Sequence, residues 1–299
     1  MKSSVQFSNL LLSEHWCINE SVRQSLVDRF LKHVATPLNA KGMNDEDEEE
    51  QEGQDTSNDS NDDSVSEDIQ YFANGKGALV CIEGILGKKI SPLQDLFGFV
   101  DVDYISLVLD AVSEDDNIES VIIYYDTPGG TVTGIPELAE QVNELSKSKD
   151  VYAYTDTMAG SCGYWLMSQS DTIYISKSAQ VGGVGVFNSV VHDPEVSKNL
   201  TFITDAEFKG IGQTPVTDKQ KAYLTGQVAV VGEMFRSDIK AMRPDIQDAD
   251  LQGQMFIGNQ AVIAGFADGI CNSVYDLIEL LSEQYEDDDS SLDEVDNNQ

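Results

Sequence analysis

One uninterrupted apolar run determines the fold class of this chain. Residues 120–125 read Ser-Val-Ile-Ile-Tyr-Tyr and contain no charged residue. Such a run, without the alternation of a half-exposed strand, is typical of a strand buried on both faces of a parallel sheet. It ends in the turn 126–130, Asp-Thr-Pro-Gly-Gly. Ligands of open α/β sheets bind beyond the carboxyl ends of the strands, so this turn is a candidate position for a site.

Strand and helix patterns alternate on both sides of this run. They follow one another at 77–85 (strand), 103–112 (helix), 135–147 (helix), 151–155 (strand), 160–170 (helix) and 172–176 (strand). Strands that alternate with helices predict an α/β domain with a largely parallel sheet. We expect residues 69–282 to form this domain, which is long enough for one sizeable core.

Acidic residues are concentrated in two short tracts. The chain has 299 residues with 53 Asp and Glu against 18 Lys and Arg, a formal net charge of −35. Residues 45–68 hold 13 of the acids and residues 283–299 hold 8, with no Lys or Arg in either tract. Tracts with so little apolar surface cannot offset the entropy of ordering. They predict a disordered linker at 43–68 and a disordered tail at 283–299, both as solvated spacers.

The first 42 residues predict a separate helical segment. Apolar residues recur every four positions from Val22 to Val34, after a capping residue at Asn19 or Ser21. A short amphipathic helix of this kind must dock on the main domain or on a partner chain. The sequence shows neither a signal-peptide core nor a run of about 20 apolar residues, so we expect neither secretion nor membrane insertion.

Composition disfavours several other classes of protein. The strong negative charge disfavours binding to nucleic acid or to an anionic membrane surface, since both are negative themselves. Four cysteines make no disulfide scaffold in a chain of this length, and three histidines leave little room for a histidine-rich metal site. We therefore expect no metal, no organic cofactor, no nucleic-acid partner and no membrane partner.

The segment 158–165, Met-Ala-Gly-Ser-Cys-Gly-Tyr-Trp, has the pattern of a nucleophile turn. A strand pattern precedes it, a helical pattern follows it, and small residues flank Ser161. A serine in this position presents its hydroxyl beside backbone amides that can hold an oxyanion. Taken alone, the segment predicts a helix N-cap at least as well, because serine is a favoured capping residue.

Two further glycine-rich segments accompany this serine. The Pro-Gly-Gly turn at 128–130 lets a backbone approach a ligand or donate amides. The segment 181–187 places three glycines among apolar residues, which favours a strand pressed against another backbone. It lacks the G-x-G-x-x-G spacing of a dinucleotide loop, so we set that interpretation aside.

In this order and spacing, the three segments resemble the signal peptide peptidase A (protease IV) family of serine peptidases. That family has a Ser-Pro-Gly-Gly turn, a Ser-Gly-Gly-Tyr nucleophile turn and a Thr-Gly-Ser-Ile-Gly-Val strand, where this chain has 127–130, 161–164 and 181–186. The resemblance covers residues 77–281. It implies the α/β Clp protease/crotonase-like fold of repeated strand-strand-helix units, and a peptide-bond hydrolase without a cofactor.

The resemblance also implies a serine–lysine dyad. Ser161 falls on the family's nucleophile, and Lys209, in a segment before a proline and a helix, falls on its general base. A lysine near its reference pKa of about 10.4 is protonated and cannot accept the serine proton. Burial lowers a lysine pKa because desolvation penalises the charge, and Phe202, Ile203 and Phe208 are available to form an apolar wall.

Backbone groups complete the implied site. The oxyanion hole would consist of the N–H of Cys162 and the N–H of Gly129 or Gly130. Substrate strands would lie along the edges at 129–133 and 183–186 by β-augmentation. The residues implied at these edges are Thr131, Gly183 and Val184.

Two positions depart from the family pattern. Many relatives have a serine that contacts the catalytic lysine where this chain has Gly183, so another hydroxyl or a water must hold Lys209. Cys162 stands where glycine is usual, and we interpret it as a small buried apolar residue. An alternative stays open at His192, a Ser-His-Asp arrangement as in Clp protease. We prefer Lys209, because its segment matches the family and the segment around His192 does not.

The beginning of the chain narrows the resemblance. Residues 15–20 and the helical pattern after them look like the N-terminus of bacteriophage head-maturation proteases of the same family, of the minor capsid protein C type. Such proteases imply capsid or scaffold proteins as substrates, self-cleavage, a homo-oligomeric ring, and a location in the host cytoplasm or the phage prohead. Two alternatives remain. One is a catalytically idle assembly or scaffolding protein, and the other is a crotonase-type acyl-CoA enzyme that would need neither Ser161 nor Lys209.

Overall fold

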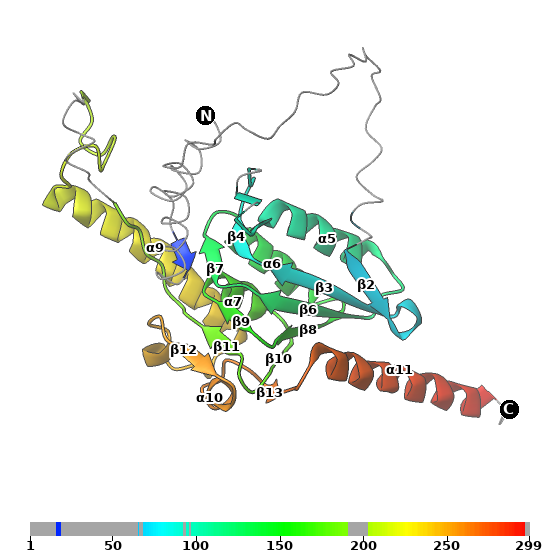
Figure 1. The fold of residues 1–299 in the computed structure, drawn as a ribbon. Coiled ribbons are helices and arrows are strands. Elements are labelled where there is room, and N and C mark those ends of the chain that lie inside the picture. The colour runs from blue at the N-terminus through cyan, green and yellow to red at the C-terminus, as the bar shows by residue number, and fades with distance from the viewer. Residues whose placement is uncertain are drawn as a thin grey trace, which may run out of the picture.

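The computed structural model describes residues 16–18, 65, 68–91, 94–95, 97–190 and 203–296. Its largest sheet has six strands in the order β13-β10-β8-β6-β3-β2 (Figure 1). The parallel strands are β3 (Gly77–Glu83), β6 (Ser120–Asp126), β8 (Asp150–Thr155), β10 (Thr172–Ile175) and β13 (Gly269–Ile270). An antiparallel edge strand, β2 (Ile69–Phe72), pairs with β3. The predicted α/β architecture with a largely parallel sheet is confirmed.

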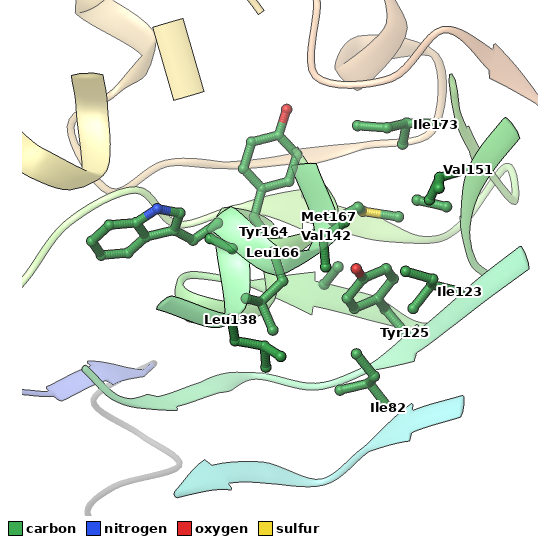
Figure 2. Close-up of a cluster of buried hydrophobic side chains, with 14 of the residues drawn as sticks. Ile82, Ile123, Tyr125, Leu138, Val142, Val151, Tyr164, Leu166, Met167 and Ile173 are labelled. Atoms are coloured by element: carbon green, nitrogen blue, oxygen red, sulfur yellow. The ribbon is translucent and has the colours of Figure 1, made fainter. Parts of the chain in front are cut away.

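Both faces of this sheet are covered, which explains the apolar run in β6. Val121, Ile123 and Tyr125 belong to the main core, whereas Ile122 belongs to a second cluster with Leu277. The main core contains residues of α5 (Val102–Glu114), α6 (Ile135–Leu145) and α7 (Cys162–Met167), and the second cluster contains residues of α11 (Val274–Asp296). Figure 2 shows the side chains of β6, α6 and α7 meeting in the main core.

The long strands β3, β6, β8 and β10 are each followed along the chain by one of four short strands. The short strands are β4 (Ile85–Gly87), β7 (Gly129–Thr131), β9 (Met158–Gly160) and β11 (Gln180–Gly182). They form two smaller sheets with β1 (Trp16–Ile18), β5 (Phe99–Asp101) and β12 (Met255–Ile257), in the orders β1-β7-β4-β5 and β12-β11-β9. The remaining elements are η1 (Ala73–Gly75), η2 (Asp248–Asp250) and α10 (Asn259–Ile263).

The long helix α9 (Asp218–Met242) is anchored at one end and projects from the body at the other (Figure 1). Its buried residues are Gly232, Phe235 and Ile239, all in the second half. The ring of Phe235 stacks on Trp165 of α7, with centroids 4.3 Å apart. The first half packs against nothing that buries a residue within the described chain. Helices gain stability mainly from packing, so within the described chain the second half of α9 is the better stabilised one.

Two predicted tracts differ from the structure. The predicted disordered tail at 283–299 is not confirmed, because α11 continues as a helix to Asp296. Leu277 and Leu281 are buried under the sheet, and once a helix is nucleated each added residue gains a hydrogen bond. Residues 16–18, inside the predicted N-terminal helical segment, form strand β1. Except for residues 16–18, Val65 and Asp68, the segments 1–42 and 43–68 lie outside the described residues. The predicted N-terminal helix and the predicted disordered linker therefore stay predictions.

Among the described residues, no helix combines the length and the apolar character needed to cross a membrane.

Candidate active site

Ser161 lies at the turn between β9 and α7 in a conformation that few side chains adopt. Its φ is 54° and its ψ is −116°, and the residue is 5% exposed. Its N–H donates to the Gly182 carbonyl at 2.7 Å, and its carbonyl accepts from the Trp165 N–H at 2.9 Å. A strained backbone of this kind costs on the order of 1–3 kcal/mol and persists only where its surroundings hold it. The hydroxyl makes no capping hydrogen bond to α7, so it is not used as a helix cap.

The helix that follows Ser161 is held from several directions. All six residues of α7 are buried. The indole N–H of Trp165 donates to Asp238 Oδ2 at 2.9 Å, and the Tyr164 hydroxyl donates to the Phe266 carbonyl at 3.0 Å. Burial raises the pKa of the Tyr164 hydroxyl, so that it stays a neutral donor. These contacts fix the position of the Ser161 backbone.

A cavity of about 370 Å³ opens beside Ser161. Its lining residues are Pro128, Met158, Gly160, Ser161, Gln180, Gly183, Gly185, Val186, Phe187, Gly253 and Met255. Among these lining residues there is no Asp, Glu, His, Lys or Arg. A search of the described residues also finds no group of three or more His, Cys, Asp or Glu side chains that could hold a metal ion. Within the described part of the chain, the lining of this cavity therefore offers Ser161 no general base.

The Pro-Gly-Gly turn lies directly against the serine turn. The Gly160 N–H donates to the Thr127 carbonyl and the Thr127 N–H donates to the Met158 carbonyl, each at 2.9 Å. Gly129 has a φ of 100°, and its N–H donates to Thr127 Oγ1 at 3.1 Å. A Cβ at Gly130 would overlap the Leu86 carbonyl, so the close approach of β7 and β4 requires glycine there.

Cys162 and Thr131 are buried between these elements. The Cys162 thiol lies 3.8 Å from the Gly130 carbonyl oxygen and 3.7 Å from that of Thr131. Both residues are at most 1% exposed. Cys162 is therefore the small buried residue that its sequence context suggested.

The glycine strand approaches Ser161 from the other side. A Cβ at Gly183 would lie 3.3 Å from the Ser161 amide nitrogen and 3.0 Å from Met255 Sδ. The Gly183 N–H donates to the Gln254 carbonyl at 2.7 Å, and Val184 is 1% exposed. Little space is left between Gly183 and Ser161. A serine at position 183, whose hydroxyl could support a catalytic lysine, would therefore lie within contact distance of Ser161.

Lys209 lies apart from this arrangement. It is exposed, in the loop that precedes α9, and it does not line the cavity. In Figure 1 this loop sits at the projecting end of α9, away from β9 and α7. Ile203, one of the predicted apolar neighbours, is 87% exposed, and Phe208 packs on Tyr223 with ring centroids 4.8 Å apart. Phe202 and His192 lie outside the described residues.

Residues 143–286, which include both the serine turn and the Lys209 loop, match the model of peptidase family S49. The matched residues make up 144 of the 299 residues, just under half of the chain. This match confirms the family resemblance drawn from the three glycine-rich segments.

Proteins similar to this chain include one from an archaeon and two from phages. The chain is 28% identical over 184 residues to "Putative protease MJ0651" of Methanocaldococcus jannaschii, covering 57% of this chain and 58% of that protein. It is 23% identical over 204 residues to capsid assembly protease C of Escherichia phage lambda, covering 66% and 46%. It is 22% identical over 230 residues to head-tail preconnector protein GP5 of Enterobacteria phage P21, covering 70% and 46%. The chain thus spans about half the length of the curated relatives it matches.

The described chain brings most of the predicted site residues together. Ser161, Cys162, Gly183 and the glycine turn meet at the cavity or beside it, whereas Lys209 stays outside. Sequence reasoning missed Gly253 and Met255, which line the cavity from the loop before β12 and from β12 itself. No local sequence pattern distinguishes a core methionine from one that faces a cavity.

Proposed function

We propose that this chain is a serine endopeptidase in which Ser161 is the nucleophile and Lys209 of a neighbouring copy is the general base. The observation that carries the proposal is the position of Ser161. Within an S49 domain, a nearly buried serine with a φ of 54° faces a cavity and leaves its hydroxyl unused as a cap. This is the arrangement expected of a nucleophile held for attack.

The exposed first half of α9 supports the proposal that a second copy supplies the general base. Exposed apolar side chains lie on this half and on the loop before it, at Phe208, Val216, Tyr223 and Val230. Tyr223 is 45% exposed and Val230 is 62% exposed on a helix that is unsupported in its first half. A second copy docked there would bury this surface and carry Lys209 to the neighbour's cavity. Burial at that interface would supply the desolvation that a neutral amine needs.

The chemistry then follows the usual course of acyl transfer. The neutral Lys209 amine accepts the proton of Ser161 as Oγ attacks the scissile carbonyl. The N–H of Cys162 and that of Gly129 or Gly130 hold the oxyanion, and Gly129 would exchange its bond to Thr127 Oγ1 for it. The lysine returns the proton to the leaving amine, and water, activated by the same amine, hydrolyses the acyl-enzyme.

The proposed substrates and setting rest on the phage relatives. Two of the similar proteins are named as a capsid assembly protease and a head-tail preconnector protein. By analogy, this chain would cleave capsid or scaffold proteins, and itself, as a homo-oligomeric ring in a phage prohead or in the host cytoplasm. The repeated strand-strand-helix units are consistent with the Clp protease/crotonase-like fold that the resemblance implies.

One observation favours a second candidate, a catalytically idle assembly protein on the same fold. Among the described residues, none that lines the cavity of the single chain is ionisable, and a chain that never meets the Lys209 of a neighbouring copy would lack this base. A His192 base and a crotonase-type site are further alternatives, and mutation of Lys209 distinguishes the His192 base from the lysine.

Coexpression with the capsid proteins of the same phage tests the proposal. Wild type, Ser161→Ala, Lys209→Ala and His192→Ala would be compared by mass spectrometry of the capsid proteins. We expect cleavage by wild type and His192→Ala and none by the other two variants. Equal cleavage by all four removes the assignment, and no cleavage by wild type favours the idle assembly protein.

A further inference from the structure

The outer edge of β7, beside the proposed nucleophile, is occupied by a distant part of the same chain. Strand β1 pairs with it antiparallel, with Trp16 opposite Thr131, Cys17 opposite Gly130 and Ile18 opposite Gly129. Figure 1 shows this short strand next to β7, far from its place in the sequence. The inner edge of β7 pairs with β4 through Leu86 and Gly130. Both edges of β7 are therefore in use.

We infer that residues 16–18 sit in the site for the substrate strand, and that an extended peptide must displace them to reach Ser161. This inference rests on the proposed peptidase function, since it names the ligand of the same site. A β-strand edge offers one row of N–H and C=O groups, so β1 and a second strand cannot both pair with it. The ligand class is an extended peptide added antiparallel to β7.

The position of β7 connects this edge to the nucleophile. The strand starts one residue after Pro128, which lines the Ser161 cavity. Its carbonyls at Gly130 and Thr131 contact the thiol of Cys162, the residue after the nucleophile. A peptide on this edge is consequently within reach of the serine turn.

The direction of β1 carries its chain toward the cavity. The segment runs from Trp16 opposite Thr131 to Ile18 opposite Gly129, and so toward Pro128 and the cavity. Gly129 is one of the two glycines proposed to donate to the oxyanion. An oxyanion donor must face the carbonyl of the bond to be cut, so the residue paired with Gly129 is the one whose carbonyl is placed to react. In this register the candidate scissile bond follows Ile18.

The tether makes a short strand an effective competitor. Residues 19–64 connect Ile18 to Val65, the next described residue, and a linked ligand binds at an effective concentration that can reach about millimolar. Three paired residues bind weakly on their own. Because β1 is covalently linked to the domain, however, it rebinds readily after each dissociation, and a free peptide must compete with it. The same length of chain, at up to about 3.3–3.6 Å per residue, is long enough to reach the edge of a neighbouring copy.

Peptide binding by a catalytically dead chain tests the inference without using catalysis. A fluorescein-labelled peptide of residues 12–22 would be titrated against Ser161→Ala chains that are full length, lack residues 1–14, or lack residues 1–20. We expect the deletion of 1–20 to tighten binding about tenfold or more, and the deletion of 1–14, which retains β1, to leave it unchanged. Equal binding by all three chains overturns the inference.

A disulfide measures the register directly and does not depend on truncation. Residues directly opposite in an antiparallel pair have Cα atoms about 4.5–5.5 Å apart, within the range that a disulfide spans. Trp16→Cys with Thr131→Cys, in a Ser161→Ala, Cys17→Ser and Cys81→Ser background, should crosslink under oxidation and lose peptide binding. Reduction should restore binding, while the single variant Trp16→Cys stays unaffected.

These outcomes separate the inference from the proposed function. Failure to crosslink, or binding that is unchanged by the crosslink, contradicts the inference even if the enzyme is active. Tighter binding after deletion of 1–20 supports it even if wild type cleaves nothing, in which case the peptidase proposal fails alone. A crosslinked monomer on a non-reducing gel shows that the strand occupies its own edge, and a crosslinked dimer shows that it occupies a neighbour's.

Discussion

The serine half and the lysine half of the proposed dyad are held very differently. Ser161 is 5% exposed, strained, and fixed by α7, whose aromatic residues reach α9 and the segment before β13. Lys209 is exposed on a loop that folds back on the first turns of α9, where Lys219 pairs with Glu207. A single chain therefore holds the proposed nucleophile in a fixed position and leaves the proposed base on a surface. Such a division is useful if activity must wait for assembly, because isolated copies would then be inactive.

The largest expected effect comes from breaking either half of the dyad. Ser161→Ala and Lys209→Ala should each lower kcat by at least about a thousandfold, since both remove a group that acts in the transition state. Lys221→Ala, at another exposed lysine on α9, is the matched control and should retain activity. Initial rates on a coexpressed capsid substrate or a derived peptide measure all three.

Mixing the two dead variants determines whether the halves belong to different copies. If Lys209 serves a neighbour's Ser161, mixed oligomers of Ser161→Ala and Lys209→Ala contain sites with both groups and regain part of the activity. Each variant incubated alone is the control. Absence of recovery, with subunit exchange verified by mass spectrometry, would show that one chain supplies both groups.

The second effect concerns the anchored half of α9. Phe235 is fully buried and stacks on Trp165, so Phe235→Ala should lower the free energy of unfolding by about 3–5 kcal/mol. Tyr223→Ala, on the exposed half, should change it by less than about 0.5 kcal/mol in a monomeric sample. Urea unfolding followed by tryptophan fluorescence compares the two. Similar losses for both would mean that the first half of α9 is packed in the isolated chain.

The contrast between the two halves also shows what the sequence could predict. The β6 strand and the serine turn are visible locally, because an apolar run and a small-residue turn have their own patterns. Strand β1 was missed because its three residues are extended only through pairing with β7, more than a hundred positions away. The length of α11 was missed because its acidic residues continue a helix nucleated by buried Leu277 and Leu281. The surroundings of a catalytic Lys209 were beyond reach, since a second chain would supply them.

The third effect should appear in assembly while the fold of the chain is retained. Val230 is 62% exposed on the unsupported half of α9, so Val230→Glu should leave the unfolding free energy of a monomer within about 0.5 kcal/mol. If this face is an interface, a buried unpaired charge there should weaken association by about 1–3 kcal/mol and lower activity in parallel. Analytical ultracentrifugation measures association, and an unchanged oligomer with unchanged activity places the interface elsewhere.

The smallest effects come from two glycines, one beside the serine turn and one in the exposed half of α9. A Cβ at Gly163, in α7, would overlap the methyl group of buried Thr127, so Gly163→Ala should cost about 1–3 kcal/mol. A Cβ at Gly226, in the exposed half of α9, would meet nothing within 4 Å, so Gly226→Ala should stabilise a monomer by about 0.5–1 kcal/mol through helix propensity. Thermal unfolding in the Val230→Glu background measures both. Gly226→Ala should also be made in the otherwise unaltered chain. If it weakens the oligomer there, the backbone of a neighbouring copy approaches α9 at Gly226, and the same contact brings the loop that carries Lys209 into the assembly.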